Sequence, residues 1–191
     1  MSHRIVFASA VLLCIATTST ARAQISVTPM IGGYVPATDV NQIGSSAENI
    51  AKTREGTLSL GLNVDLGPLR GTLAYASGTT IKNASSQEIG KGNVLAAAAD
   101  FVIRPLPRIL VQPYLLAGAG KKFYKYDASA TLASGATKDA FALHGGIGAD
   151  LSLGKMGVVA ELTDFLSKGA EDKWNAHDAF LMFGVKVPLG R

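Results

Sequence analysis

The stretch "TLSLGLNVDLGPLRGTLAYAS", residues Thr57–Ser77, alternates apolar and polar side chains. Its first half has apolar residues at every second position, namely Leu58, Leu60, Leu62, Val64 and Leu66. After Gly67-Pro68 the alternation resumes. Successive side chains of a β-strand point to opposite faces, so each half predicts a strand with one apolar and one polar face. The Gly-Pro dipeptide predicts a tight turn, and the whole stretch therefore predicts a β-hairpin.

The first residues have the pattern of an export signal. Arg4 gives a positive start, Ile5 to Ala16 forms an apolar stretch, and Ala21-Arg22-Ala23 fits the small-x-small rule for cleavage. The apolar stretch is shorter than the roughly 20 residues that a spanning helix needs, which disfavours an N-terminal anchor. We therefore expect a signal peptide over residues 1–23 and a single mature domain over residues 24–191.

The composition excludes several classes of protein. Hydrophobic residues make up 48% of the chain and charged residues 17%, against roughly 25% charged residues in soluble domains. Loss of the signal lowers the net charge of +4 by two, and no clustered basic stripe is present, so nucleic acid is not an expected partner. The one cysteine, Cys14, lies in the signal, so no disulfide or thiol-ligated metal is expected in the mature domain.

The alternation of the first stretch recurs along the whole mature chain. The alternating runs are 25–36, 57–66, 69–77, 93–103, 109–121, 139–151, 158–163 and 178–189. Long polar segments join them in alternation with tight breaks at Gly67-Pro68, at "RPLPR" (104–108) and at Gly154-Lys155. The alanines of "NVLAAAADFVI" (93–103) favour a helix, but this run precedes a proline-rich turn and completes an even count, so we interpret it as a strand.

Two kinds of barrel are compatible with eight alternating strands. A soluble lipocalin-like barrel points apolar side chains inward and carries many charges outside, whereas a membrane barrel has an apolar exterior and a polar lumen. The polar faces here consist of Thr, Ser, Asn and Gly with few charges, which suits a crowded interior better than a soluble surface. Backbone groups in lipid must be satisfied internally, so the spanning sheet has to close. The sequence therefore predicts an all-β fold, an eight-stranded antiparallel transmembrane up-and-down β-barrel.

The export signal, the eight runs, the "QPYLLAGAG" strand (112–120) and four long polar loops resemble the small OmpA/OmpX-like outer-membrane β-barrel proteins of Gram-negative bacteria, often called porin-family proteins. The resemblance covers the whole mature chain and is one of pattern more than of motif. Two features depart from it. No peptidoglycan-binding domain is expected after the barrel, and the chain ends in Arg191 and not in an aromatic residue.

The predicted lumen carries a set of polar and charged residues: Asp65, Arg70, Asp100, Gln112, His144, Asp150, Glu161 and Lys186. Counting from the Gly67-Pro68 turn places Asp65 opposite Arg70. Counting about "RPLPR" places Asp100 opposite Gln112.

Counting about Gly154-Lys155 places Glu161 near Gly148 and diagonal to Asp150, and Lys186 enters from the last strand. The acidic residues of this set outnumber Arg70 and Lys186, so water, a cation or a protonated carboxyl has to balance the rest. The set is either a plug or gate or a structural network. We favour the network, because buried charges must be paired or hydrogen-bonded.

His144 is the candidate for a catalytic base, since some small outer-membrane barrels are enzymes that act on lipid A. Such a site needs a serine within hydrogen-bond reach and an acid that orients the imidazole. The count places His144 opposite Phe165 and not opposite Glu161, with no inward serine beside it, so we expect no catalytic site. His177 lies near Asp178 in the last polar region, and no spacing joins it to His144 in a metal site. No cofactor and no metal are expected.

The predicted function is that of an integral outer-membrane β-barrel protein with a structural or surface-interaction role and no wide pore. The alternatives are a lipid A-modifying enzyme and a small-solute channel. The expected partners are outer-membrane lipid, lipopolysaccharide, the barrel assembly machinery during insertion and an unidentified external ligand at the loops. We expect a monomer, and outward Tyr75, Phe123 and Phe141 are expected in an aromatic girdle near the loop ends.

Overall fold

The computed structural model describes residues 25–37, 53–82, 88–106, 110–126, 138–168 and 174–189. Its strands are β1 (Ile25–Pro36), β2 (Thr53–Arg54), β3 (Thr57–Leu66), β4 (Leu69–Lys82), β5 (Glu88–Ile103), β6 (Val111–Tyr126), β7 (Lys138–Leu153), β8 (Met156–Lys168) and β9 (Trp174–Leu189). The predicted signal peptide, residues 1–23, lies outside the described residues. Within the described ranges, no helix is long and apolar enough to cross a bilayer.

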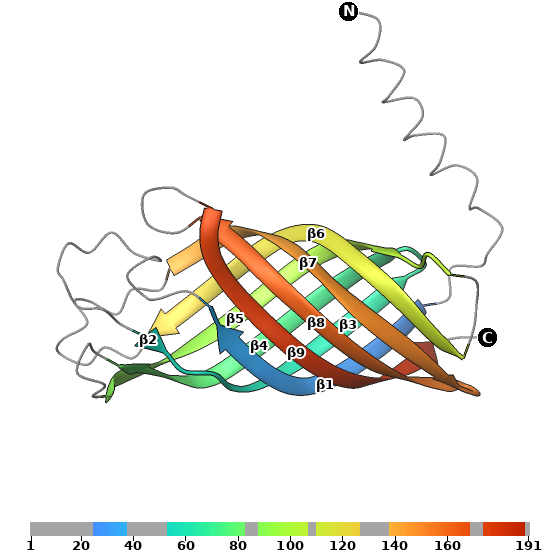
Figure 1. Cartoon of the computed structure of the whole chain (residues 1–191), viewed down its shortest axis with the longest axis horizontal. Coiled ribbons are helices and arrows are strands. Elements are labelled where there is room, and N and C mark those ends of the chain that lie inside the picture. The colour runs from blue at the N-terminus through green and yellow to red at the C-terminus, as the bar shows by residue number, and fades with distance from the viewer. Residues whose placement is uncertain are drawn as a thin grey trace, which may run out of the picture.

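The eight long strands form one closed antiparallel sheet. Sequence neighbours pair with each other, β1 pairs with both β3 and β9, and the pairing of β4 with β5 completes the circle. Figure 1 shows the resulting cylinder of tilted strands, with the short β2 beside β4 at one rim. The predicted eight-stranded up-and-down barrel is confirmed. Closure leaves no open sheet edge, which is the condition for crossing a bilayer with strands.

The two ends of the barrel differ in their connections. Gly67 and Gly154 adopt positive φ values of 68° and 66° in the turns that join β3 to β4 and β7 to β8. Ile25, at the start of β1, pairs with Leu189 at the end of β9, so these two strand ends lie at this same rim (Figure 1). The segments that join strands at the opposite rim are 38–52, 83–87, 127–137 and 169–173, which lie outside the described residues. Short turns are typical of the periplasmic end of outer-membrane barrels and long segments of the outer end.

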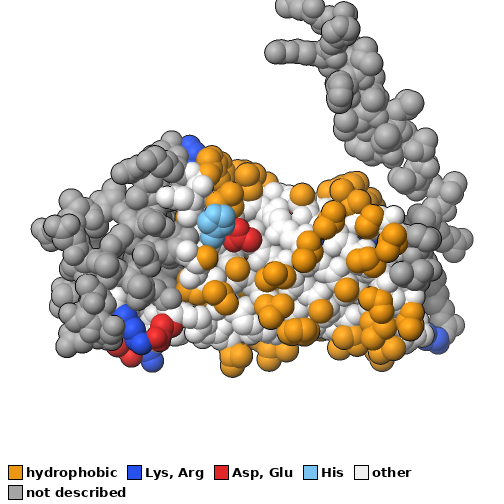
Figure 2. Space-filling model, in the orientation of Figure 1, with side chains coloured by type: hydrophobic (Ala, Val, Ile, Leu, Met, Phe, Trp, Pro, Cys, Tyr) orange, Lys and Arg blue, Asp and Glu red, His pale blue; other side chains and the backbone are white. Residues whose placement is uncertain are grey.

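The outer face of the barrel is apolar. Side chains at alternate positions are strongly exposed, for example Leu58 at 75%, Ile31 at 58% and Ile147 at 57%, while the positions between them are buried. Figure 2 shows the apolar side chains spread over the visible outer wall between the two rims. The predicted outward positions of Tyr75 and Phe141 are confirmed, and Trp174 packs edge-on against Phe141 with ring centroids 6.3 Å apart. An exterior of this kind is stable only in hydrocarbon, so the barrel spans a membrane.

The strands extend further at the outer rim than the sequence predicted. Residues 78–92 were expected to form a loop, but β4 continues to Lys82 and β5 begins at Glu88. A register shift between Ala76 and Thr79, with Gly78 at a φ of 72°, accommodates the change of side-chain pattern. Trp174, also expected in a loop, begins β9. Polar side chains do not prevent ladder hydrogen bonds, so strands can continue into water beyond the apolar belt.

The pairing predicted across "RPLPR" is wrong. Asp100 pairs with Gly118, and Gln112 pairs with Asp150 of β7. The ladder between β5 and β6 ends at Ile103 and Leu115, so β6 begins four residues before its contact with β5. Pro105 cannot donate a ladder hydrogen bond, and the described ladder ends before it, so the count across this connection does not give the register.

Candidate functional site: the polar lumen

The charged residues near the short-turn end of the lumen converge on Arg70. Asp65 and Arg70 are direct cross-strand partners next to the β3–β4 turn, as the sequence count predicted. Arg70 Nε donates to Asp65 Oδ1 at 2.6 Å. Arg70 Nη1 also forms an ion pair with Glu161, which reaches across the lumen from β8, and the Arg70 side chain is 1% exposed. One guanidinium therefore links three strands and compensates two buried carboxylates.

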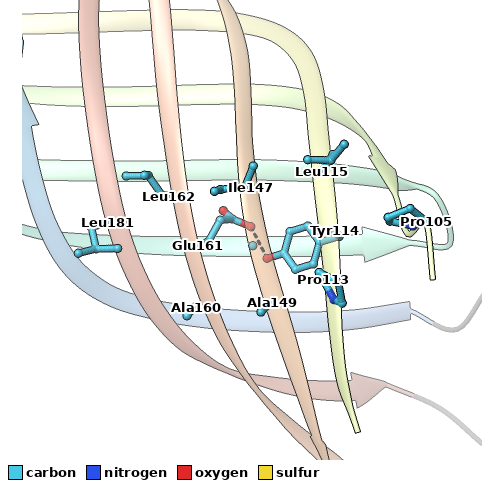
Figure 3. Close-up of a pocket in the computed structure, with 11 residues that line it drawn as sticks. Pro105, Pro113, Tyr114, Leu115, Ile147, Ala149, Ala160, Glu161, Leu162 and Leu181 are labelled. Carbon is cyan, nitrogen blue, oxygen red and sulfur yellow. Dashed lines mark hydrogen bonds between the residues drawn. The ribbon is translucent and has the colours of Figure 1, made fainter. Parts of the chain in front are cut away.

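Glu161 is held by neutral donors as well. Tyr114 Oη donates to Glu161 Oε2 at 2.6 Å, and Asn63 Nδ2 donates to Oε1 at 3.3 Å. Figure 3 shows the Tyr114 side chain directed at the Glu161 carboxylate across β7. This approach requires Gly148, which pairs with both residues, because a Cβ there would collide with the Tyr114 ring. The missing side chain at Gly148 therefore leaves the space in the lumen that the Tyr114 ring occupies.

Lys186 completes the cluster at the short-turn rim. Its Nζ lies 2.9 Å from Asp150 Oδ2 and 3.4 Å from Asp65 Oδ2. Asp65 also accepts a hydrogen bond from Ser26 Oγ at 3.3 Å. The structure therefore brings together Asp65, Arg70, Asp150, Glu161 and Lys186. Gln112 does not join them, since its side-chain amide donates to the Leu106 carbonyl at 3.4 Å.

Asp100 and His144 form a separate pair deeper in the lumen. His144 Nδ1 lies 2.7 Å from Asp100 Oδ1, and Thr72 Oγ1 donates to Asp100 Oδ2 at 2.6 Å. The imidazole stacks on Phe165, its predicted cross-strand partner, with centroids 3.9 Å apart. The predicted position of His144, opposite Phe165 and not opposite Glu161, is confirmed. Asp100, the acid beside the imidazole, was not identified from the sequence, because the count about "RPLPR" placed Asp100 opposite Gln112.

The pair of Asp100 and His144 lacks the third element of a nucleophilic site. The Nε2 atom of His144 is buried and has no hydrogen-bond partner among the described residues. A serine or other nucleophile would have to lie within hydrogen-bond reach of that atom. Within the same ranges, no group of three His, Cys, Asp or Glu side chains is arranged to hold a metal ion.

A third cluster near the outer rim was missed in the sequence analysis. Lys122 Nζ donates to Asp178 Oδ2 at 2.7 Å and to the carbonyls of Phe165 and Ala176 at 2.9 and 3.0 Å. Tyr34 and Tyr124 both donate to Asp178 through their hydroxyls. The alternation of β6 continues past Lys121 and places Lys122 inside, so the period itself could have identified it. The comparison of acidic residues with Arg70 and Lys186 alone therefore left out one lumen cation, Lys122, and one lumen acid, Asp178.

The three clusters fill the lumen with paired charges. Arg70, Glu161, Asp65, Asp100, His144, Lys122 and Asp178 are each at most 3% exposed. The largest fully buried side chains include Tyr34, Tyr114, Tyr124, Phe165 and Phe180, which fill the lumen in and around the clusters. Eight strands give a lumen that side chains alone can fill, and this arrangement can brace the barrel wall by cross-lumen ion pairs.

The comparisons with known proteins agree with this architecture. No protein-family model matches the chain, and no curated protein matches its sequence. The crystal structure of the outer membrane protein OprG from Pseudomonas aeruginosa is similar with a TM-score of 0.59 at 14% identity, covering 89% of this chain and 98% of that chain. Neisserial surface protein A is similar with a TM-score of 0.53 at 15% identity, covering 86% of this chain and 97% of that chain. By its fold, the chain is therefore a small eight-stranded β-barrel of the outer-membrane type.

Proposed function

We propose that the protein is an integral outer-membrane barrel with a structural or surface-interaction role, and that it has neither a wide pore nor an enzymatic activity. The observation that carries the proposal is the packed lumen. Arg70 joins Asp65 and Glu161 across one end, and Lys122 joins Asp178 near the other, with side chains that are almost completely buried. A continuous water path along this axis would require both pairs to separate.

The location and partners of the barrel follow from the same features. An apolar exterior without open edges, together with the expected export signal, fits the outer membrane. We infer a monomer that the barrel assembly machinery inserts, with lipopolysaccharide around its outer half. Lys82, Lys91 and Lys125 lie near the outer rim, where phosphate groups of that lipid are available.

Conductance distinguishes the structural role from the channel. The purified full-length mature chain, reconstituted in planar bilayers, is expected to give no stable conductance step under conditions in which a general porin gives large ones. A variant with alanine at Lys122, Asp178, Arg70, Asp65 and Glu161 removes the pairs at both ends of the lumen and serves as the control that a conductive form can be detected. A steady, ohmic conductance of the unmodified chain would overturn the proposal in favour of a small-solute channel.

Lipid A analysis tests the enzymatic alternative. Cells that express the chain and cells that express His144→Ala are expected to have identical lipid A by mass spectrometry. A mass change in lipid A that requires the chain and disappears with His144→Ala would establish an enzyme.

Surface phenotypes test the interaction role. Replacement of segments 38–52 or 127–137 by short Gly/Ser linkers is expected to change cell adhesion or autoaggregation while uptake of a periplasmically hydrolysed β-lactam stays constant. The matched control is a barrel that keeps segments 38–52 and 127–137 and carries a neutral epitope inserted in the segment under test. The two-residue turn at Gly154-Lys155 is too short for an equal deletion and cannot serve as the control. A change of uptake without a change of surface behaviour would contradict this role.

A further inference from the structure

The outer wall of β6 to β9 carries rows of large and small outward side chains, so its surface is uneven. The ladder pairs place outward side chains in rows that cross these four strands. One row is Leu115, Ile147, Leu162 and Leu181, and the next toward the short-turn rim is Pro113, Ala149, Ala160 and Phe183. A row of large residues is thus followed by a row whose two middle members, Ala149 and Ala160, are small. A third row, Val111, Leu151, Val158 and Val185, raises the wall again on the far side.

Pro113, Ala149 and Ala160 of this second row line an apolar groove of about 510 Å³. Leu115, Ile147, Leu162 and Leu181 border it, and Pro105 lies at one end (Figure 3). Tyr114, Gly148 and Glu161, which alternate with the outward residues along the same strands, also line the groove. The groove is continuous with the lipid-exposed belt, so hydrocarbon chains are the molecules that reach it.

A polar pair lies on the opposite side of the leucine-rich row. Asp164 occupies the row of Ala117, Gly145 and Ala179, which are all small. His177 Nδ1 lies 2.6 Å from Asp164 Oδ2, with the side chains 46% and 38% exposed. The other carboxylate oxygen, Oδ1, is turned toward the wall and accepts no hydrogen bond within the described part of the chain. Figure 2 shows a histidine and an acidic side chain next to each other on the outer wall, beside apolar side chains.

The position of Asp164 and His177 along the membrane normal determines which lipid groups can contact them. Phe141 belongs to the aromatic girdle, and Asp164 pairs with Gly145, four residues further along β7 toward the short-turn rim. Four residues of a strand span about 13 Å, and the tilt of the strand shortens this distance along the barrel axis, so the pair lies at the inner edge of the interface, at the level of the ester and amide linkages of the lipids. A carboxylate at this depth is destabilised unless a hydrogen-bond donor satisfies it. The glycerol esters of phospholipids offer only acceptors at this level.

We propose that the wall of β6 to β9 is a seat for lipid A, the acylated glucosamine anchor of lipopolysaccharide. Its amide N–H and acyl-chain hydroxyl groups donate to the Asp164 carboxylate, which turns about its soft side-chain torsion, and one acyl chain lies in the groove over Ala149 and Ala160. This inference rests on the proposed outer-membrane location and gives the lipopolysaccharide contact a defined place on the wall.

Direct binding to the full mature chain in detergent micelles tests the seat. Trp174, the only tryptophan of the chain, lies three residues from His177 and packs on Phe141, so its fluorescence reports on this part of the wall. The probes are purified lipid A and phosphatidylethanolamine of matched acyl length. We expect lipid A to bind about tenfold more tightly, and Asp164→Leu to abolish this preference because a charged acceptor is lost.

The groove has its own variants and controls. Ala160→Phe and Ala149→Phe fill the groove and are expected to weaken lipid A binding severalfold. Ala99→Phe, an equal change at an outward position of β5 away from the groove, is expected to have no effect. Asp139→Asn, which removes the exposed partner of Lys121, controls for the loss of a carboxylate. Heat-modifiable migration on detergent gels confirms that each variant is folded.

The possible failures are distinguishable. Equal affinity for lipid A and phosphatidylethanolamine would overturn the seat and indicate an unspecific hydrocarbon contact. Lipid A binding that is insensitive to Asp164→Leu and Ala160→Phe would overturn the seat but leave the proposed lipopolysaccharide contact at the rim intact. A dimer in native mass spectrometry that Asp164→Leu dissociates would assign this wall to a second copy of the chain instead.

Discussion

Removal of the Arg70 charge is the perturbation that most severely tests the proposed bracing of the lumen. In Arg70→Met, the Glu161 carboxylate loses its cation, and Asp65 keeps Lys186 at 3.4 Å and the hydrogen bond from Ser26. Removal of one partner of a buried ion pair typically costs about 3–5 kcal/mol, because the remaining charge stays desolvated. We expect the free energy of unfolding to fall by about that amount. Urea titration in phospholipid vesicles, followed by the fluorescence of Trp174, measures it from the midpoint and the slope.

A second substitution separates charge compensation from packing. In Arg70→Met/Glu161→Gln, the uncompensated charge is gone, while Tyr114 and Asn63 keep a side-chain oxygen to donate to. The double variant is therefore expected to be more stable than Arg70→Met by about 1–3 kcal/mol. The exposed pair of Lys121 and Asp139 supplies the matched control, since Lys121→Met is expected to leave the midpoint unchanged. The reasoning is refuted if Arg70→Met behaves like Lys121→Met, or if the double variant is the least stable of the set.

Three further outcomes follow from the described contacts. Lys122→Met leaves Asp178 buried without its nearest cation and is expected to lower the free energy of unfolding by about 3–5 kcal/mol. Lys122→Met/Asp178→Asn is expected to recover part of this loss, and equal urea midpoints of the two variants would contradict the prediction. Gly148→Ala pushes a methyl group into the Tyr114 ring and is expected to lower the free energy of unfolding by about 1–3 kcal/mol in the wild-type background. The loss is expected to be much smaller in the Tyr114→Ala background, and additive effects would show that the two residues do not compete for space. Leu73→Arg places a charge on the lipid face at a side chain that is 43% exposed and is expected to cost about 2–4 kcal/mol near the bilayer centre, whereas unchanged vesicle stability would place Leu73 outside the belt.

The strand positions could be predicted because they depend on a period of two. Leu58 to Leu66 alternate so regularly that the face of each residue follows from its parity. The register of a pair could be predicted only across a two-residue turn. Gly67-Pro68 fixes Asp65 opposite Arg70, and Gly154-Lys155 fixes Glu161 opposite Gly148. Across "RPLPR" the count failed, because the stagger of a barrel is a property of the closed sheet and not of one connection.

The partners of the lumen charges could not be predicted from strand pairs. Arg70 has Asp65 and Asp100 as cross-strand neighbours, yet it pairs with Asp65 and with Glu161 from the other side of the lumen. That contact depends on how the closed barrel brings β4 opposite β8. Lys122, by contrast, could have been placed in the lumen from the sequence, because its inward position follows from the period of β6. It was overlooked because the polar residues around it suggested that the strand had already ended.

The orientation of the wall is the central claim, and site-directed spin labelling tests it most directly. The chain's only cysteine, Cys14, lies in the predicted signal, so single cysteines at residues 58–66 of the mature barrel can be labelled without background. In phospholipid vesicles, oxygen collisions are expected to be frequent at Leu58, Leu60, Leu62, Val64 and Leu66 and rare at the positions between them. Frequent collisions of a water-soluble nickel chelate at the leucine positions would place that face in water and contradict the membrane-spanning barrel.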